Sequence, residues 1–97
     1  MKVIAVEKLE DCFDGSIVCC YRFDEAWSRS SIEQLAGLGT LEYFADFPRP
    51  FFRVRGAGSL EIKGVEGARH CRVLLRSDEQ GILRDSLDEC LRIGASG

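Results

Sequence analysis

The sequence lacks long apolar runs and has few of the residues that usually mark a chemical site. Among its 97 residues there are one histidine, one tryptophan, one methionine and two prolines. The first apolar run, residues 3–6, is shorter than the core of a secretory signal, and no run approaches the roughly 20 residues of a membrane-spanning helix. We therefore expect a soluble, cytoplasmic protein that does not associate with a membrane.

Motifs for metal or thiol chemistry are also missing, although five cysteines are present. The cysteines are Cys12, Cys19, Cys20, Cys71 and Cys90, and no two of them form a C-x-x-C motif. Adjacent residues of a strand point to opposite faces, so Cys19 and Cys20 cannot readily chelate one ion, and neither can His70 and Cys71. In a reducing cytosol thiols stay reduced. We expect no disulfide, no metal site, and cysteines that pack as small apolar residues.

The single histidine argues against hydrolytic catalysis. A catalytic triad needs a histidine between a nucleophile and an acid, whereas His70 lies in a basic stretch that disfavours its protonation. Gly56 and Gly58 match the start of a nucleotide-binding fingerprint, but the third glycine and the following helix are absent from the pattern. We expect a non-enzymatic protein without a cofactor.

Six runs of the chain are typical of β-strands. Residues 3–9 and 16–23 flank Asp14-Gly15 and predict a hairpin. In the second run the odd-numbered residues from Ile17 to Phe23 share the core face. Residues 40–47 predict a strand that Pro48 and Pro50 stop, and 51–55, 59–65 and 70–76 predict a meander with turns at 56–58 and 66–67.

Two helices are indicated by capping and periodicity. The first begins between Asp24 and Ser30, where Ser30 and Glu33 form a capping box, and ends at Gly37 or Gly39. The second begins with a Ser77–Gln80 box and ends near Arg92, and its apolar face is Leu83, Leu87, Cys90 and Leu91. Trp27, just before the first helix, is expected to anchor the core.

These elements predict one α+β domain over residues 1–97, with the last three to four residues as a loose tail. The sheet is mostly antiparallel, the element order is β-β-α-β-β-β-β-α, and the two helices pack on one face. The other face of the sheet is then left open.

Basic residues concentrate in the meander of this acidic chain, whose formal net charge is −3. Residues 49–76 contain seven basic and two acidic residues, while 1–48 contain four and nine, and 77–97 contain two and five. Alternation along the strands directs the apolar residues inward and the cations outward. The candidate ligand-binding face comprises Phe51, Arg53, Arg55, Lys63, His70, Arg72 and Arg76.

We interpret this face as the surface of a small binding module for an anionic ligand or partner. An acidic protein, a nucleotide or a single-stranded nucleic acid fits its chemistry, although the net negative charge opposes avid, non-specific DNA binding. A solvated face, partly neutralised by Glu61, is an alternative interpretation. A structural, homodimerising domain is another, with Phe51 and Leu74 on this face or a sheet edge at the contact, so we expect a monomer or weak homodimer. Thiol or metal chemistry at Cys12, Cys20 or Cys71 ranks last.

Overall fold

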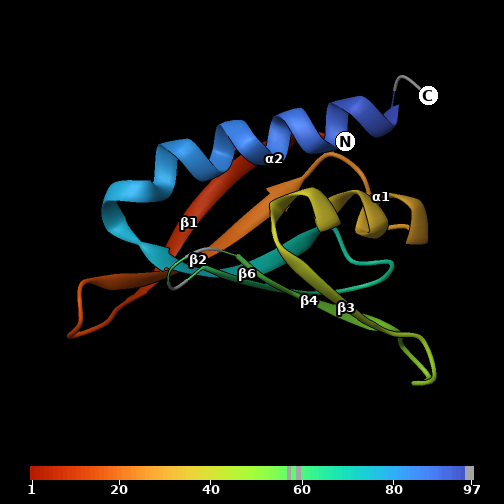
Figure 1. Cartoon of the computed structure of the whole chain (residues 1–97), viewed down its shortest axis with the longest axis horizontal. Helices are drawn as coiled ribbons and strands as arrows, with labels where there is room; N and C mark the ends of the chain where they lie inside the picture. The colour runs from red at the N-terminus through yellow and green to blue at the C-terminus, as the bar shows by residue number, and fades with distance from the viewer. Residues whose placement is uncertain (57, 59, 96–97) are drawn as a thin grey trace.

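The chain folds into a six-stranded antiparallel sheet with helices on one face (Figure 1). The structure, a computed structural model, describes residues 1–56, 58 and 60–95, and describes 77, 80 and 92–95 by their backbone alone. The strands are β1 (Val3–Asp11), β2 (Ser16–Phe23), β3 (Thr40–Phe44), β4 (Phe51–Arg55), β5 (Glu61–Val65) and β6 (His70–Arg76). Their order in the sheet is β1-β2-β6-β5-β4-β3. The α+β class and the element order predicted from the sequence are confirmed.

The β1–β2 hairpin turns where the sequence predicts. Gly15 has φ +88°, a left-handed conformation that glycine adopts without strain, and the Asp14 carboxylate accepts a hydrogen bond from the Ser16 amide at 3.1 Å. β1 runs to Asp11, past the predicted end at residue 9, because Asp11 still pairs with Ile17 of β2. β1 is one edge of the sheet, and most of its residues are exposed.

The first helical segment is α1 (Arg29–Gln34) followed by the 3-10 helix η1 (Leu35–Leu38). Its capping box differs from the predicted one: the Ser28 hydroxyl accepts a hydrogen bond from the Ser31 amide at 3.1 Å, and the Ser31 hydroxyl accepts one from the Ser28 amide at 2.9 Å. Ser28 has an extended backbone, as an N-cap residue must, so the helix begins at the next residue, Arg29. Glu33 instead pairs with Arg29 at 3.3 Å.

The second helical segment is the 3-10 helix η2 (Ser77–Glu79) followed by α2 (Gln80–Ala95). The side chains of the predicted Ser77–Gln80 box lie outside the described residues. Leu83, Leu87 and Leu91 are buried against the sheet, as their spacing predicts. α2 passes the predicted end at residue 92 and includes Gly94, which a helix tolerates at a cost of about 1 kcal/mol. Of the predicted tail, residue 95 is helical, and 96 and 97 lie outside the described residues.

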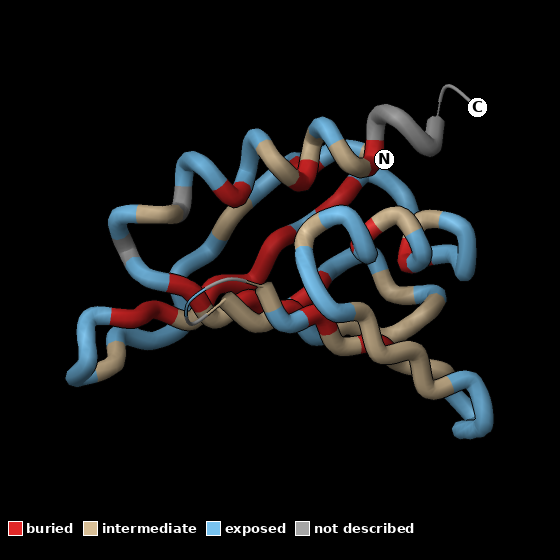
Figure 2. The backbone as a smooth tube through the Cα atoms, viewed as in Figure 1, coloured by how far each residue is buried: buried red, intermediate tan, exposed pale blue. Residues whose placement is uncertain are grey.

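The core lies between the sheet and the helices, where buried positions follow the central strands (Figure 2). Trp27 is 2% exposed, its ring meets Phe23 and Phe52 edge-to-face with centroids 4.9 Å from each, and its Nε1 donates a hydrogen bond to the His70 carbonyl at 3.0 Å. The indole therefore buries a large apolar surface with its polar atom satisfied. Its predicted role as a core anchor is confirmed.

Within the part of the chain that the structure describes, no helix has both the length and the apolar character needed to cross a membrane.

Gly64 of β5 is required by the packing of Phe52. The two residues are cross-strand partners, and a Cβ on Gly64 would lie 2.5 Å from Cζ of Phe52 and 3.3 Å from Cβ of Cys71. The phenyl ring thus occupies the space that a side chain at position 64 would need. Buried interiors are close-packed, so neither neighbour has room to retreat.

We expect Gly64→Ala to lower the free energy of unfolding by about 1 to 3 kcal/mol through overpacking. Gly81→Ala is the matched control, because a Cβ there meets nothing within 4 Å and alanine favours the helix. Urea unfolding followed by tryptophan fluorescence measures both. Equal effects of the two substitutions would contradict the packing argument.

Tyr21 carries a polar atom that the fold does not satisfy. Its hydroxyl is buried without a hydrogen-bond partner among the described residues, and burial raises the pKa of Tyr21 to about 12. Removing a buried, unpaired polar group relieves its desolvation cost.

We therefore expect Tyr21→Phe to raise the free energy of unfolding by about 1 kcal/mol. Tyr43→Phe is the control, since the Tyr43 hydroxyl donates to the Glu66 carboxylate, and its loss should destabilise the protein. Thermal and urea unfolding compare the two variants. A decrease in stability for Tyr21→Phe would show that its hydroxyl has a partner.

Candidate functional site

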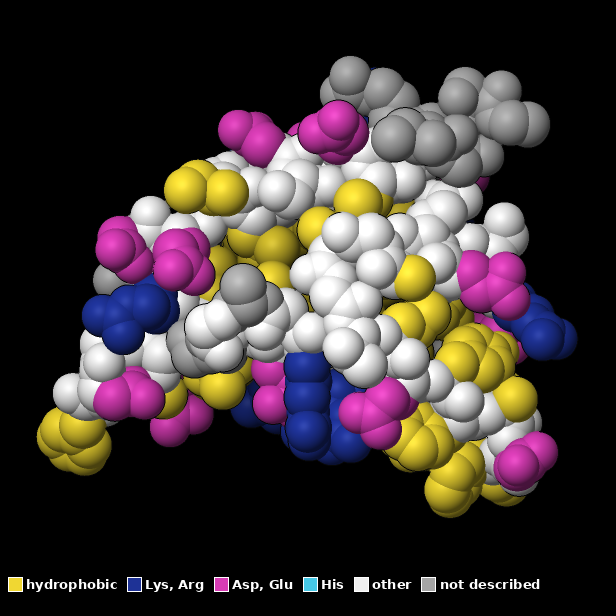
Figure 3. All heavy atoms as spheres, viewed as in Figure 1, with side chains coloured by type: hydrophobic (Ala, Val, Ile, Leu, Met, Phe, Trp, Pro, Cys, Tyr) yellow, Lys and Arg dark blue, Asp and Glu magenta, His cyan; other side chains and the backbone are white. Residues whose placement is uncertain are grey.

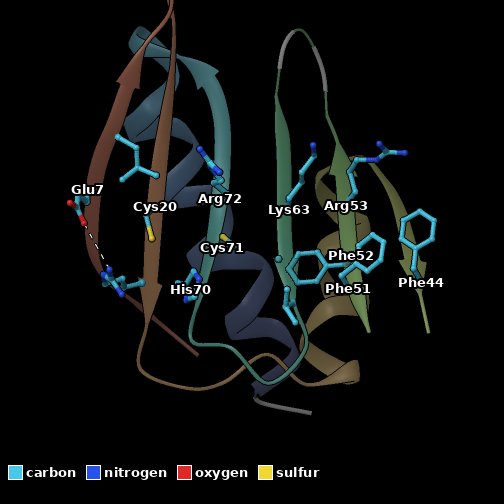
Figure 4. A pocket seen from close by; sticks show the side chains of 14 residues that line it. Glu7, Cys20, Phe44, Phe51, Phe52, Arg53, Lys63, His70, Cys71 and Arg72 are labelled. Carbon is cyan, nitrogen blue, oxygen red and sulfur yellow. Dashed lines mark ion pairs between the residues drawn. The ribbon is translucent and has the colours of Figure 1, made fainter. Parts of the chain in front are cut away.

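The open face of the sheet, opposite the helices, carries a row of three cations (Figure 4). Lys63 of β5 is the direct cross-strand partner of both Arg72 on β6 and Arg53 on β4. Direct partners project to the same face of a sheet, so Arg53, Lys63 and Arg72 form one line across three adjacent strands. We call these three residues the cationic row.

Neighbouring carboxylates neutralise the row unequally. The Arg53 guanidinium donates from Nη2 to both carboxylate oxygens of Glu42, at 3.0 and 3.1 Å, and Lys63 Nζ lies 3.2 Å from Glu61 Oε1. Arg72 is exposed and has no ion pair among the described residues. The positive charge available to a ligand is therefore centred on Arg72 and shared with Lys63.

The remaining cations on this face lie toward the strand ends. Arg55 ends β4, and Arg76 ends β6, where its Nε is 4.0 Å from Asp78 Oδ1. His70 begins β6, opposite Arg22 of β2. Five of the seven predicted site residues line one cavity: Phe51, Arg53, Lys63, His70 and Arg72. Arg55 and Arg76 share the face but not the cavity.

An aromatic cluster adjoins the cationic row, and the sequence reasoning identified one of its three members. The rings of Phe44 and Phe51 stack with centroids 4.6 Å apart and planes 21° apart, and the Phe47 ring is 5.0 Å from Phe51. Phe47 is 52% exposed. We call Phe44, Phe47 and Phe51 the aromatic cluster.

The sequence prediction did not include Phe44 and Phe47, and the reason is where β3 ends. The sequence predicts strand through residue 47, whereas β3 stops at Phe44 and the chain turns before Pro48. Phe44 has the same parity as Glu42, so an alternation argument extended to β3 would have placed it on the open face once the β3–β4 pairing was known. Phe47 lies beyond the strand, where alternation gives no signal.

A cavity of about 840 Å³, open to solvent on the sheet surface, is lined by the cationic row and by Phe44 and Phe51 of the aromatic cluster. Residues from all six strands line it. The β5–β6 pairing ends at Gly64 and Cys71, while β6 continues to pair with β2 and β5 with β4. Where the β5–β6 pairing ends, the cavity reaches Phe52 and Cys71 of the core.

The cysteines have the environment of packing residues. None of the five forms a disulfide, and desolvation by burial raises the pKa of Cys19, Cys71 and Cys90, which keeps these thiols protonated. His70 is exposed and Cys71 buried, on opposite faces as the alternation predicts. No group of three His, Cys, Asp or Glu side chains with metal-binding geometry occurs in the described residues.

Acidic and basic side chains are interspersed on the surface. In Figure 3, acidic side chains lie along α2, and Lys and Arg side chains gather beneath the sheet with acidic side chains on either side of them. The basic patch of this net-negative protein is therefore local and partly neutralised.

Comparisons of the chain with protein-family models, with curated proteins and with solved structures found no match.

Proposed function

We propose that this protein is a non-enzymatic binding module that holds an anionic ligand on the open face of its sheet. The single observation that carries the proposal is the direct pairing of Arg72 with Lys63, with no carboxylate on Arg72 among the described residues. An anion placed over this pair would accept charge-assisted hydrogen bonds from both strands.

The cost of this arrangement supports a functional role. Like charges directly opposite each other destabilise an antiparallel pair, and the row contains two such pairs in succession, Arg72 with Lys63 and Lys63 with Arg53. Glu42 and Glu61 offset this repulsion at Arg53 and Lys63, and no carboxylate offsets it at Arg72 among the described residues. An anion bound at Arg72 would remove the remaining repulsion.

The homodimer interpretation fits the face less well. Phe51 and Leu74, the apolar residues predicted to mark a dimer contact, are each partly covered by their neighbours. A two-fold contact centred on this face would also bring the cationic row of one copy toward the row of the other. Light scattering at two protein concentrations tests for self-association directly.

The first test separates binding from stability at one residue. We expect Arg72→Gln to weaken binding of inorganic polyphosphate and to reduce the slope of log affinity against log salt by about 1. The same change removes a like-charge pair, so the free energy of unfolding should stay equal or rise by a few tenths of a kcal/mol. Calorimetric titration at three salt concentrations and urea unfolding measure the two effects. Unchanged affinity would remove Arg72 from the site.

The second test asks whether location or net charge matters. Lys63→Glu with Arg72→Glu should abolish polyphosphate binding, and Lys2→Glu with Arg84→Glu should retain it, because Arg84 lies on α2 behind the sheet. Each substitution replaces +1 with −1, so both double variants have a formal net charge of −7 instead of −3. Amide chemical shifts on titration should move along β4, β5 and β6. Equal loss in both variants, or no binding by the wild type, would overturn the proposal.

A further inference from the structure

We propose that the ligand of this face is a single-stranded nucleic acid, an inference that rests on the proposed function and specifies its ligand. Phosphates of the strand lie on Lys63 and Arg72, and a base packs against the aromatic cluster. Both contacts are possible at once because the cationic row and the aromatic cluster are adjacent on the same face of the sheet.

The cationic row and the aromatic cluster meet on β4. Phe51 and Arg53 are two residues apart on one face, a separation of about 7 Å along a strand. A nucleotide joins a phosphate to a planar base and uses both features. A phosphate or polyphosphate uses only the cations, and an acidic peptide supplies carboxylates without a ring in each residue. The presence of three phenylalanines beside the cations therefore favours nucleic acid.

The shape of the cavity favours a strand over a free nucleotide. Sites for small molecules bury about 70 to 90% of the ligand surface, whereas this cavity is open along the face and takes its lining from all six strands. The row from β6 to β4 spans two strand spacings, about 10 Å. Arg55 and Arg76 lie at one end of the face, with Glu61 directly opposite Arg55 and Asp78 Oδ1 4.0 Å from Arg76 Nε. An open basic surface with aromatic side chains is the usual platform for single strands.

The experiment compares a fluorescent thymidine strand of about eight nucleotides with an abasic strand of the same phosphate number. Fluorescence anisotropy at low salt gives both affinities for the wild-type protein. We expect the thymidine strand to bind at least about fivefold more tightly, the lower end of the effect of stacking one base on an aromatic ring.

Two variants test the aromatic cluster. Phe51→Leu keeps an apolar side chain but removes the flat ring, and Phe47→Ala removes a half-exposed ring outside the strands. Both should reduce the preference for thymidine toward one without changing affinity for the abasic strand. Phe13→Ala is the matched control: Phe13 is fully exposed on the β1–β2 turn, at the opposite end of the molecule from the β3–β4 connection (Figure 1).

The outcomes distinguish this inference from the proposed function. Equal affinity for the two strands in the wild type would overturn the nucleic-acid inference and leave the anion-binding proposal standing. Failure of both strands and of polyphosphate to bind would overturn both. Thymidine monophosphate or a duplex binding as tightly as the single strand, or a polyglutamate peptide binding more tightly, would also overturn the inference.

Discussion

One constraint organises the whole structure: side chains alternate along six strands that are covered by helices on one side only. The strands β2, β4, β5 and β6 present their apolar residues to the helices, which fixes their pairing register, because a slip of one residue would exchange the two faces. The odd residues of β2 and β6 and the even residues of β4 and β5 accordingly point to the core. The residues of the other parity point away from the helices and form the open face. The cations lie on this face because they alternate with the buried apolar residues.

Local patterns were enough to predict the strands, the helices and the faces that β2, β4, β5 and β6 bury. Gly15, the meander from residue 51 to 76 and the apolar face of α2 all follow from turn chemistry and periodicity. The strand order could not be predicted, because the pairing of β6 with β2 joins residues about 50 positions apart and depends on long-range packing. The details at element ends were also missed, since Ser28 and Ser30 offer equivalent caps and the backbone conformation decides between them.

The unpredicted strand order creates the proposed site. β3 is the neighbour of β4, which brings Glu42 opposite Arg53 and neutralises it. β6 lies between β2 and β5, so the direct partners of Arg72 are Cys20 and Lys63, and neither is acidic. Two arginines that the sequence places on the same face with the same predicted exposure therefore differ in the charge they present. A sequence-based list of cations has no means of making this distinction.

The position of the cavity follows from the packing beneath it. Trp27 presses Phe52 toward the sheet from the helix side, and Phe52 covers Gly64, so β5 has no side chain on the core face at that residue. The β5–β6 ladder ends at the same residue, and past it β6 continues toward β2 and β5 toward β4. The sheet is thus hollowed beside Arg72, which has no ion pair among the described residues, and next to its stacked phenylalanines. The core interaction that stabilises the fold also determines where a ligand can approach.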